Sequence, residues 1–309
     1  MRHFFTAALV ALSALGAAPV NAEVPVRAAL ALPHDHVLPG VPFDMVVTYT
    51  NLTNHPITIG STTATLVVTF ENGSTSVLHQ PEGHDQHVIT PRVPLVLSPG
   101  ESKMQAVSLD PIPNWFSYSS FSAPGTYNLA LDLNIADDDL ETVASIRTSA
   151  ATLTRVNPVG LDAELWSRMQ QVSDGHWASD SFRTIYAGGQ LAEEIMALHP
   201  ASEYYPYALV ITARSRARRP LATLLEAAER FRSSPARPYL MMAAAESAHA
   251  EARRAERKRD FAAALKHATV AQTIYRDALS TRTAGVQETA TYALPNVSQL
   301  IERASKKAH

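Results

Sequence analysis

Histidines gather in two polar stretches near the beginning of the chain, and they are the side chains best suited to metal chemistry. His34 and His36 flank an aspartate in the first stretch, and His84 and His87 lie in the second. Imidazoles together with carboxylates bind zinc or copper, and alternate residues of a strand share one face. No motif with fixed ligand geometry, such as HExxH, accompanies them. We therefore weigh a metal site, in a metal-binding protein or metalloenzyme, against a solvated polar loop, which we prefer.

A run of aromatic residues is the second candidate site. It contains Trp115, Phe116 and Tyr118, ends at Phe121 and lies between two strand-like segments. Exposed aromatic rings stack on sugar rings or anchor a protein partner, so one possible function is that of a carbohydrate-binding module. The alternative is structural, with Trp115 and Phe116 filling the end of a strand domain or its interface with a neighbouring domain.

Three tyrosines close together in the second half of the chain are candidate interface anchors. In a helix, Tyr204 and Tyr207 share one side, whereas Tyr205 is turned about 100° from Tyr204, so that one core cannot take all three. Tyrosine is enriched at interfaces because it combines a large apolar area with a hydroxyl group. We expect at least one to be exposed, the alternative being that all three pack against neighbouring helices or the strand domain.

Motifs of the common catalytic classes are missing from the sequence. It contains no cysteine, which excludes disulfides, thiol nucleophiles and zinc–thiolate sites, and no GxSxG sequence. The formal net charge of −3 gives no general reason to bind nucleic acid or an anionic membrane, and the charged residues 251–260 are expected to pair within a helix or face water. We expect a binding or scaffold protein that is not an enzyme, needs no cofactor and interacts with another protein.

The segment 23–156, which must position the histidines and the aromatic run, shows the period-two alternation of β-strands. Pro-Gly pairs beginning at positions 39, 99 and 124 mark turns between the alternating runs. Such runs bury one face and leave the other wet, which predicts a β-sandwich and puts Asp44 on a wet face. The clearest apolar faces consist of Phe43, Met45, Val47 and Tyr49, and of Tyr127, Leu129, Leu131, Leu133 and Ile135.

The residues 97–102 and the sequence Pro124-Gly125-Thr126-Tyr127 resemble those of bacterial immunoglobulin-like domains. In those domains a Pro-Gly-Thr-Tyr turn starts the penultimate strand. The resemblance implies an immunoglobulin-like β-sandwich in which Tyr127 forms a tyrosine corner, with its hydroxyl group bound back to the chain. It implies a fold and not a function.

The pattern changes at residues 157–160, after which alanine and arginine become frequent and apolar residues recur at helical spacing. We expect helices to start near Asp162, Ser179 or Asp180, Ser202, Pro220, Pro238, Asp260 and Asn296.

The pair Asp260-Phe261, followed by Ala264 and Ala271, resembles the second helix of a tetratricopeptide repeat. Ala252 falls at the small packing position of the preceding helix, and residues 200–209 resemble a repeat junction. The resemblance implies helical hairpins that bind a protein or peptide in a concave face.

The first 22 residues have the pattern of a secretory signal peptide. A short basic start precedes an apolar run that ends near Ala18, and cleavage after Ala22 would leave Glu23 as the first residue. The run is shorter than the ~20 residues of a membrane span, which is the alternative. We therefore expect a periplasmic or secreted protein without a membrane span. The fold class is a segregated α+β, with a signal peptide at 1–22, an immunoglobulin-like sandwich at 23–156 and a tetratricopeptide-like helical domain at 157–309.

Overall fold

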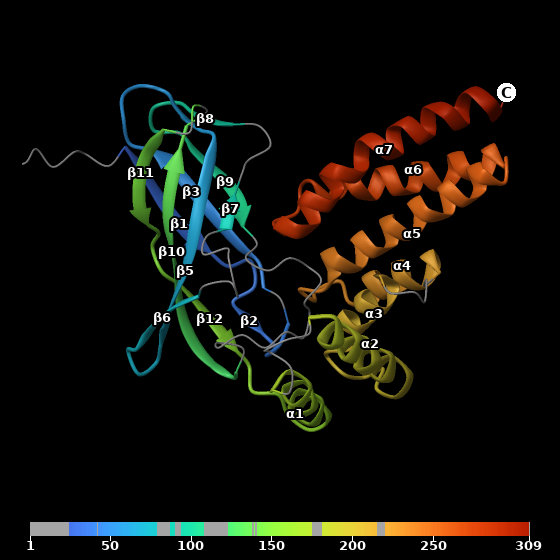
Figure 1. Cartoon of the computed structure of the whole chain (residues 1–309), viewed down its shortest axis with the longest axis horizontal. Helices are drawn as coiled ribbons and strands as arrows, with labels where there is room; N and C mark the ends of the chain where they lie inside the picture. Colours follow the sequence, from blue (N-terminus) through green and yellow to red (C-terminus); the bar gives the residue numbers. More distant parts are fainter. Residues whose placement is uncertain are drawn as a thin grey trace, which may run out of the picture.

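A computed structural model of the chain places strands in the first half of the sequence and helices in the second (Figure 1). The structure describes residues 25–41, 43–78, 87–89, 94–107, 123–137, 139, 141–174, 181–214 and 220–308. Within these ranges the last strand ends at Arg155 and the first helix begins at Leu161. The expected α+β class with segregated elements is confirmed, and the change from strands to helices falls where the sequence pattern changes.

The strands form three sheets, and the named strands pair antiparallel except for β2 with β12. One sheet has the order β1-β3-β9, a larger one has the order β2-β12-β10-β5-β6 with β11 on β10 and β7 on β5, and β4 pairs with β8. The described strands are β1 (Val26–Ala31), β2 (His36–Val37), β3 (Met45–Asn51), β4 (Ile57–Ile59), β5 (Ser61–Phe70), β6 (Thr75–Leu78), β7 (His87–Ile89), β8 (Leu95–Leu97), β9 (Ser102–Val107), β10 (Gly125–Ala136), β11 (Thr142–Arg147) and β12 (Ala151–Arg155).

Alternation along the strands builds the core between the sheets. Met45, Val47 and Tyr49 of β3 are buried, as expected, and join one apolar cluster with the alternate residues of β10, including Leu129 and Leu131. Residues between them on β10 are exposed or half-buried, because neighbouring side chains of a strand point to opposite faces. The strand region is therefore consistent with the predicted β-sandwich.

Tyr127 begins the buried face of β10. Its hydroxyl group donates a hydrogen bond of 2.8 Å to the backbone carbonyl of Ala123, and its side chain is 5 % exposed. Its ring meets Phe70 edge-on, with the ring centroids 5.6 Å apart. The prediction that this hydroxyl group is bound back to the chain is confirmed.

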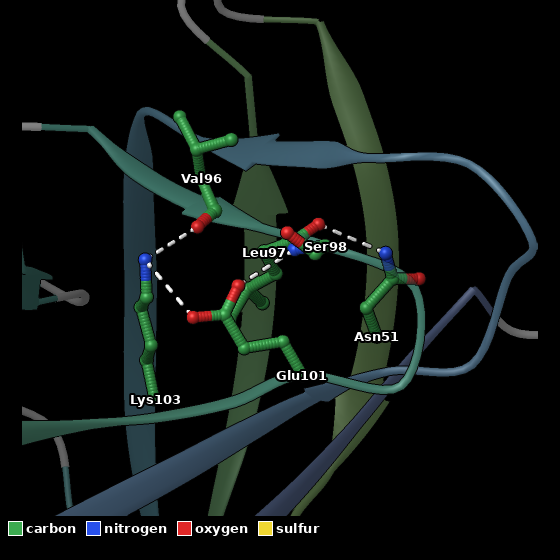
Figure 2. A network of polar contacts seen from close by, with 6 residues as sticks. All are labelled: Asn51, Val96, Leu97, Ser98, Glu101 and Lys103. Carbon is green, nitrogen blue, oxygen red and sulfur yellow. Dashed lines mark hydrogen bonds and ion pairs between the residues drawn. The ribbon is translucent and has the colours of Figure 1, made fainter.

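A polar network fastens the turn between β8 and β9 to the end of β3 (Figure 2). The buried amide of Asn51 donates to the carbonyl of Leu97 at 3.0 Å, and Glu101 accepts the backbone N–H of the residue after β8 at 2.8 Å. Lys103 donates to a β8 carbonyl at 2.6 Å and lies 3.4 Å from a Glu101 oxygen. Gly100, with a φ of 73°, supplies the left-handed residue of the turn.

The helices follow one another as neighbours along the stack in Figure 1. Contacts join α1 with α2, α2 with α3, and each of α4, α5 and α6 with the next helix, and α5 also contacts both α3 and α7. Such nearest-neighbour packing is typical of stacked helical hairpins. The described helices are α1 (Leu161–Asp174), α2 (Ser181–Leu198), α3 (Tyr205–Arg214), α4 (Leu221–Arg230), α5 (Arg237–Arg257), α6 (Phe261–Ala278) and α7 (Ala284–Ala308).

The helices α1 to α6 begin within three residues of the expected positions, and α7 begins much earlier than expected. Asp260 caps α6, since its carboxylate accepts the N–H of Ala263 at 3.0 Å, and Pro220 immediately precedes α4. Asp162 does not precede α1 but lies in its first turn, where it accepts a hydrogen bond of 2.6 Å from the Ser202 hydroxyl group.

The last helix begins well before the expected Asn296, at Ala284. Pro295 lies inside it, and a proline removes only one backbone N–H from a helix. Val286 and Ala290, which precede the proline, are buried, so that packing holds the first half of the helix in place. None of the helices in the described ranges is both long enough and apolar enough to cross a membrane.

Candidate functional site

The three tyrosines lie where helix α3 meets the rest of the molecule. Tyr204 is fully buried and its hydroxyl group donates to the carbonyl of Pro39 at 3.1 Å, while Tyr207 is 3 % exposed. Their shared side of the chain faces the strand region and the core, so neither of them is the exposed tyrosine that we expected among the three. Tyr205 is half-buried and packs beside Phe231, with ring centroids 5.9 Å apart.

Five of the other predicted site residues lie wholly or partly outside the described residues. This holds for Trp115, Phe116, Tyr118 and His84, and for the side chain of His87 in β7. The exposed His36 contacts its neighbour Asp35, with Nδ1 2.9 Å from the carboxylate, and His34 is half-buried. Within the described ranges no three or more His, Cys, Asp or Glu side chains are placed to hold one metal ion.

A pocket opens between α5 and α7, on a part of the chain that the sequence analysis did not select. Its volume is about 310 Å³. Five of its six lining residues carry hydrogen-bond donors, and two of these carry positive charges. The lining residues are His249 and Arg253 of α5 and Asn296, Gln299, Leu300 and Arg303 of α7, and we call this pocket the α5–α7 groove.

The two arginines of the groove differ in their partners. Arg303 binds Glu256 through Nε and Nη2, at 2.9 and 3.2 Å, and these hydrogen bonds hold the pKa of Glu256 below its usual value. Arg253 is exposed and forms no ion pair with the residues that the structure describes. Among the described residues Arg253 therefore has no direct ion pair, although its charge contributes to the lowered pKa of Glu256.

His249 is the one titratable lining residue of the groove besides the two arginines. It is half-buried, and its ring meets Tyr275 edge-on with the ring centroids 6.4 Å apart. Burial, together with the nearby charge of Arg253, lowers the pKa of His249. The imidazole is therefore mainly neutral near pH 7, when it can donate or accept a hydrogen bond.

Helical spacing indicates each of the two rows of side chains that line this groove, but not that the rows meet. His249 and Arg253 are four residues apart on α5, and Asn296, Gln299 and Arg303 recur at intervals of three and four on α7. The sequence predicts only that the charged residues 251–260 pair within their own helix or face water, because spacing within one helix does not indicate which helix packs beside it. Only the packing of α5 against α7 brings the two rows together.

A buried acid at the junction of strands and helices is the second unexpected feature. Asp44 is 6 % exposed, although strand alternation put it on a wet face, because that face meets helices there. Its two carboxylate oxygens accept hydrogen bonds from Tyr239 at 3.1 Å and Thr283 at 3.0 Å. Burial outweighs both hydrogen bonds and raises the pKa of Asp44 to about 6.

Comparisons with known proteins identify no family for this chain. No family model matches, and no curated protein matches. Solved structures that resemble part of the chain include the CARDB domain of a Pyrococcus furiosus protein, at 13 % identity over 43 % of this chain and 94 % of that one, with a TM-score of 0.24.

Two further similar structures are matched over smaller shares of their own chains. The sporulation control protein Spo0M from Bacillus subtilis has 11 % identity over 48 % of this chain and 55 % of its own, with a TM-score of 0.26. A β-glucosidase from Erythrobacter marinus has 13 % identity over 42 % of this chain and 15 % of its own, with a TM-score of 0.23. These similarities are too weak to assign a fold family or a function to the chain.

Proposed function

We propose that this protein is an exported, non-enzymatic binding or scaffold protein of the periplasm or cell exterior. In this proposal the strand region is an immunoglobulin-like domain, and the helices form a tetratricopeptide-like stack that holds an acidic segment of a partner protein. The α5–α7 groove is the observation that carries the proposal, because its donor-rich lining suits the carboxylates of such a segment.

The charges of the groove favour an acidic ligand over a neutral one. Arg253 has no ion-pair partner in the described chain, and a guanidinium group binds a carboxylate through two parallel hydrogen bonds. The amides of Asn296 and Gln299 add donors and acceptors that suit the backbone of a peptide. The remaining lining residue, Leu300, is buried and belongs to the apolar core beneath the polar residues.

The proposal assigns binding and no reaction to the groove. Its lining contains one imidazole, of His249, two guanidinium groups and two amides, all of which can form hydrogen bonds to a peptide. The sequence signals discussed above, a leader followed by a chain without common catalytic motifs, agree with this assignment.

Two peptide libraries that differ only in charge test the proposal. The first contains Asp and Glu at fixed positions, and the second contains Asn and Gln at those positions. Immobilised protein, beginning at Glu23, should retain the acidic library and release it as the salt concentration rises, since salt screens exposed charges. Arg253→Glu should lower this retention by at least about fivefold, because it reverses the unpaired charge.

The matched control is Arg276→Glu, which makes the same charge change at an exposed position of α6 outside the groove. It should bind the acidic library as the wild type does. Equal retention of the two libraries by the wild type, or equal losses in the two variants, would contradict the proposal. Conversion of a retained peptide into a product would contradict the assignment as a non-enzyme.

A further inference from the structure

One short segment of the strand region makes most of the described hydrogen bonds across the junction. Pro39 accepts from Tyr204 next to α3, and Asp44 accepts from Tyr239 in the first turn of α5 and from Thr283 immediately before α7. Pro39 and Asp44 therefore bind residues at the beginnings of α3, α5 and α7, of which α5 packs against both of the others (Figure 1).

We propose that Asp44 is a pH-sensitive latch, whose neutral carboxyl group holds the strand region firmly on the beginnings of α5 and α7 and whose ionisation loosens that contact. The inference is independent of the α5–α7 groove as a binding site. It rests on the placement of a carboxyl group, almost fully buried, between elements that are far apart in the sequence.

The groups that face Asp44 compensate a negative charge only partly. Tyr239 from α5 and Thr283 from the start of α7 give it two neutral hydroxyl donors. Tyr207 from α3 is a third buried hydroxyl group, and its pKa is raised by burial and by the charge of Asp44 but lowered by Arg155 from β12. The Arg155 Nη1 donates to the carbonyls of Leu38 and Val41, at 2.8 and 2.7 Å.

A neutral carboxyl group can keep both of these hydrogen bonds. It carries one O–H donor and one carbonyl acceptor, and the hydroxyl groups of Tyr239 and Thr283 can each donate or accept. Ionisation leaves the contacts in place but adds a buried charge that water would solvate better. Opening the junction lets water reach the carboxylate, and the ionised form therefore favours the open junction.

The direction of the pH effect follows from the pKa values. The pKa of Asp44 is raised from 3.8 to about 6 in the folded protein, so that the closed junction binds more protons than the open one between these values. The contribution of Asp44 to closing is largest below pH 3.8 and falls as the pH rises through about 6. The full shift corresponds to a change of about a hundredfold in the closing equilibrium.

Hydrogen exchange of the full chain from Glu23 onward, measured by mass spectrometry, tests the latch. Peptides that cover β3 and the first turns of α5 and α7 should exchange faster at about pH 7.5 than at about pH 5, by up to about tenfold after correction for the chemical rate. Asp44→Asn, which cannot ionise, should lose this difference. Asp132→Asn, which removes an exposed acid paired with Arg147 on the sandwich, should retain it.

A second variant does not depend on the stability of Asp44→Asn. The hydroxyl group of Tyr239 lowers the pKa of Asp44, so Tyr239→Phe should move the midpoint of the pH-dependent exchange to higher pH. An unchanged or lower midpoint would overturn the proposal. So would wild-type exchange that is the same at both pH values, or a pH dependence that persists in Asp44→Asn.

Discussion

The hydroxyl group of Tyr127 offers the clearest test at the scale of a residue. Tyr127→Phe removes the hydrogen bond to Ala123 and leaves the ring against Phe70, so the free energy of unfolding should fall by only about 1 kcal/mol. Tyr127→Ala also removes the buried ring and should cost about 3–5 kcal/mol. Urea unfolding measures both changes. Equal stability of the wild type and the Phe variant would show that the tie to Ala123 contributes nothing.

Tyr127 was predictable from the sequence, because the turn and the strand that position it are adjacent in the chain. Asp44 was not. Alternation along a strand predicts which residues point away from the core of their own sheet. It does not predict whether water or a neighbouring helix covers those residues. Helical geometry placed Tyr204 and Tyr207 on one side correctly, but which structure covers that side depends on contacts far away in the sequence.

At the scale of elements, substitutions of two glycines distinguish the cost of backbone strain from the cost of a steric clash between elements. Gly40 and Gly100 have nearly the same φ, 74° and 73°, a region that costs about 1–2 kcal/mol for other residues. A Cβ at Gly40 would lie 2.8 Å from the ring of Trp166 in α1, whereas a Cβ at Gly100 would meet nothing within 4 Å. Gly40→Ala should therefore be less stable than Gly100→Ala by about 1–3 kcal/mol in urea unfolding. Equal losses of stability in the two variants would show that α1 can shift away from the added methyl group with no loss of free energy.

The existence of elements was easier to predict than their ends. Asp260 marks the start of α6 through a local hydrogen bond, which the sequence contains in full. The start of α7 depends on the burial of Val286 and Ala290 against other elements, and this overrides the interruption at Pro295. The α5–α7 groove likewise depends on contacts between elements, since neither of its two rows of side chains forms a pocket alone.

At the scale of the molecule, the buried junction predicts that the two regions recognise each other. Residues 23–156 and 157–309, produced separately, should each show its own secondary structure by circular dichroism and should elute together in size-exclusion chromatography after mixing. The reason is that Gly40 fits against Trp166 and Asp44 binds two helix starts. Gly40→Ala in the first piece should weaken the association. Separate elution of two folded pieces would contradict the prediction, as would failure of either piece to fold.

The order of the regions could be predicted because each has its own periodicity, two for strands and 3.6 for helices. Their mutual placement could not be predicted. One continuous apolar cluster runs from the strand core into the helices, but no local pattern encodes which residues meet across it.

The positions of the partners of Asp44 in the sequence also affect the order in which the protein can fold. Tyr239 lies 195 residues after Asp44, and Thr283 lies 239 residues after it. Contacts that close such long loops form late in folding, and the strand region leaves the ribosome long before either partner is made. Before α5 and α7 dock, Asp44 lacks the two hydroxyl groups that bind it, and the burial that raises its pKa is incomplete. Its shifted titration is therefore a property of the finished chain, and a truncated or incompletely folded chain would lack it.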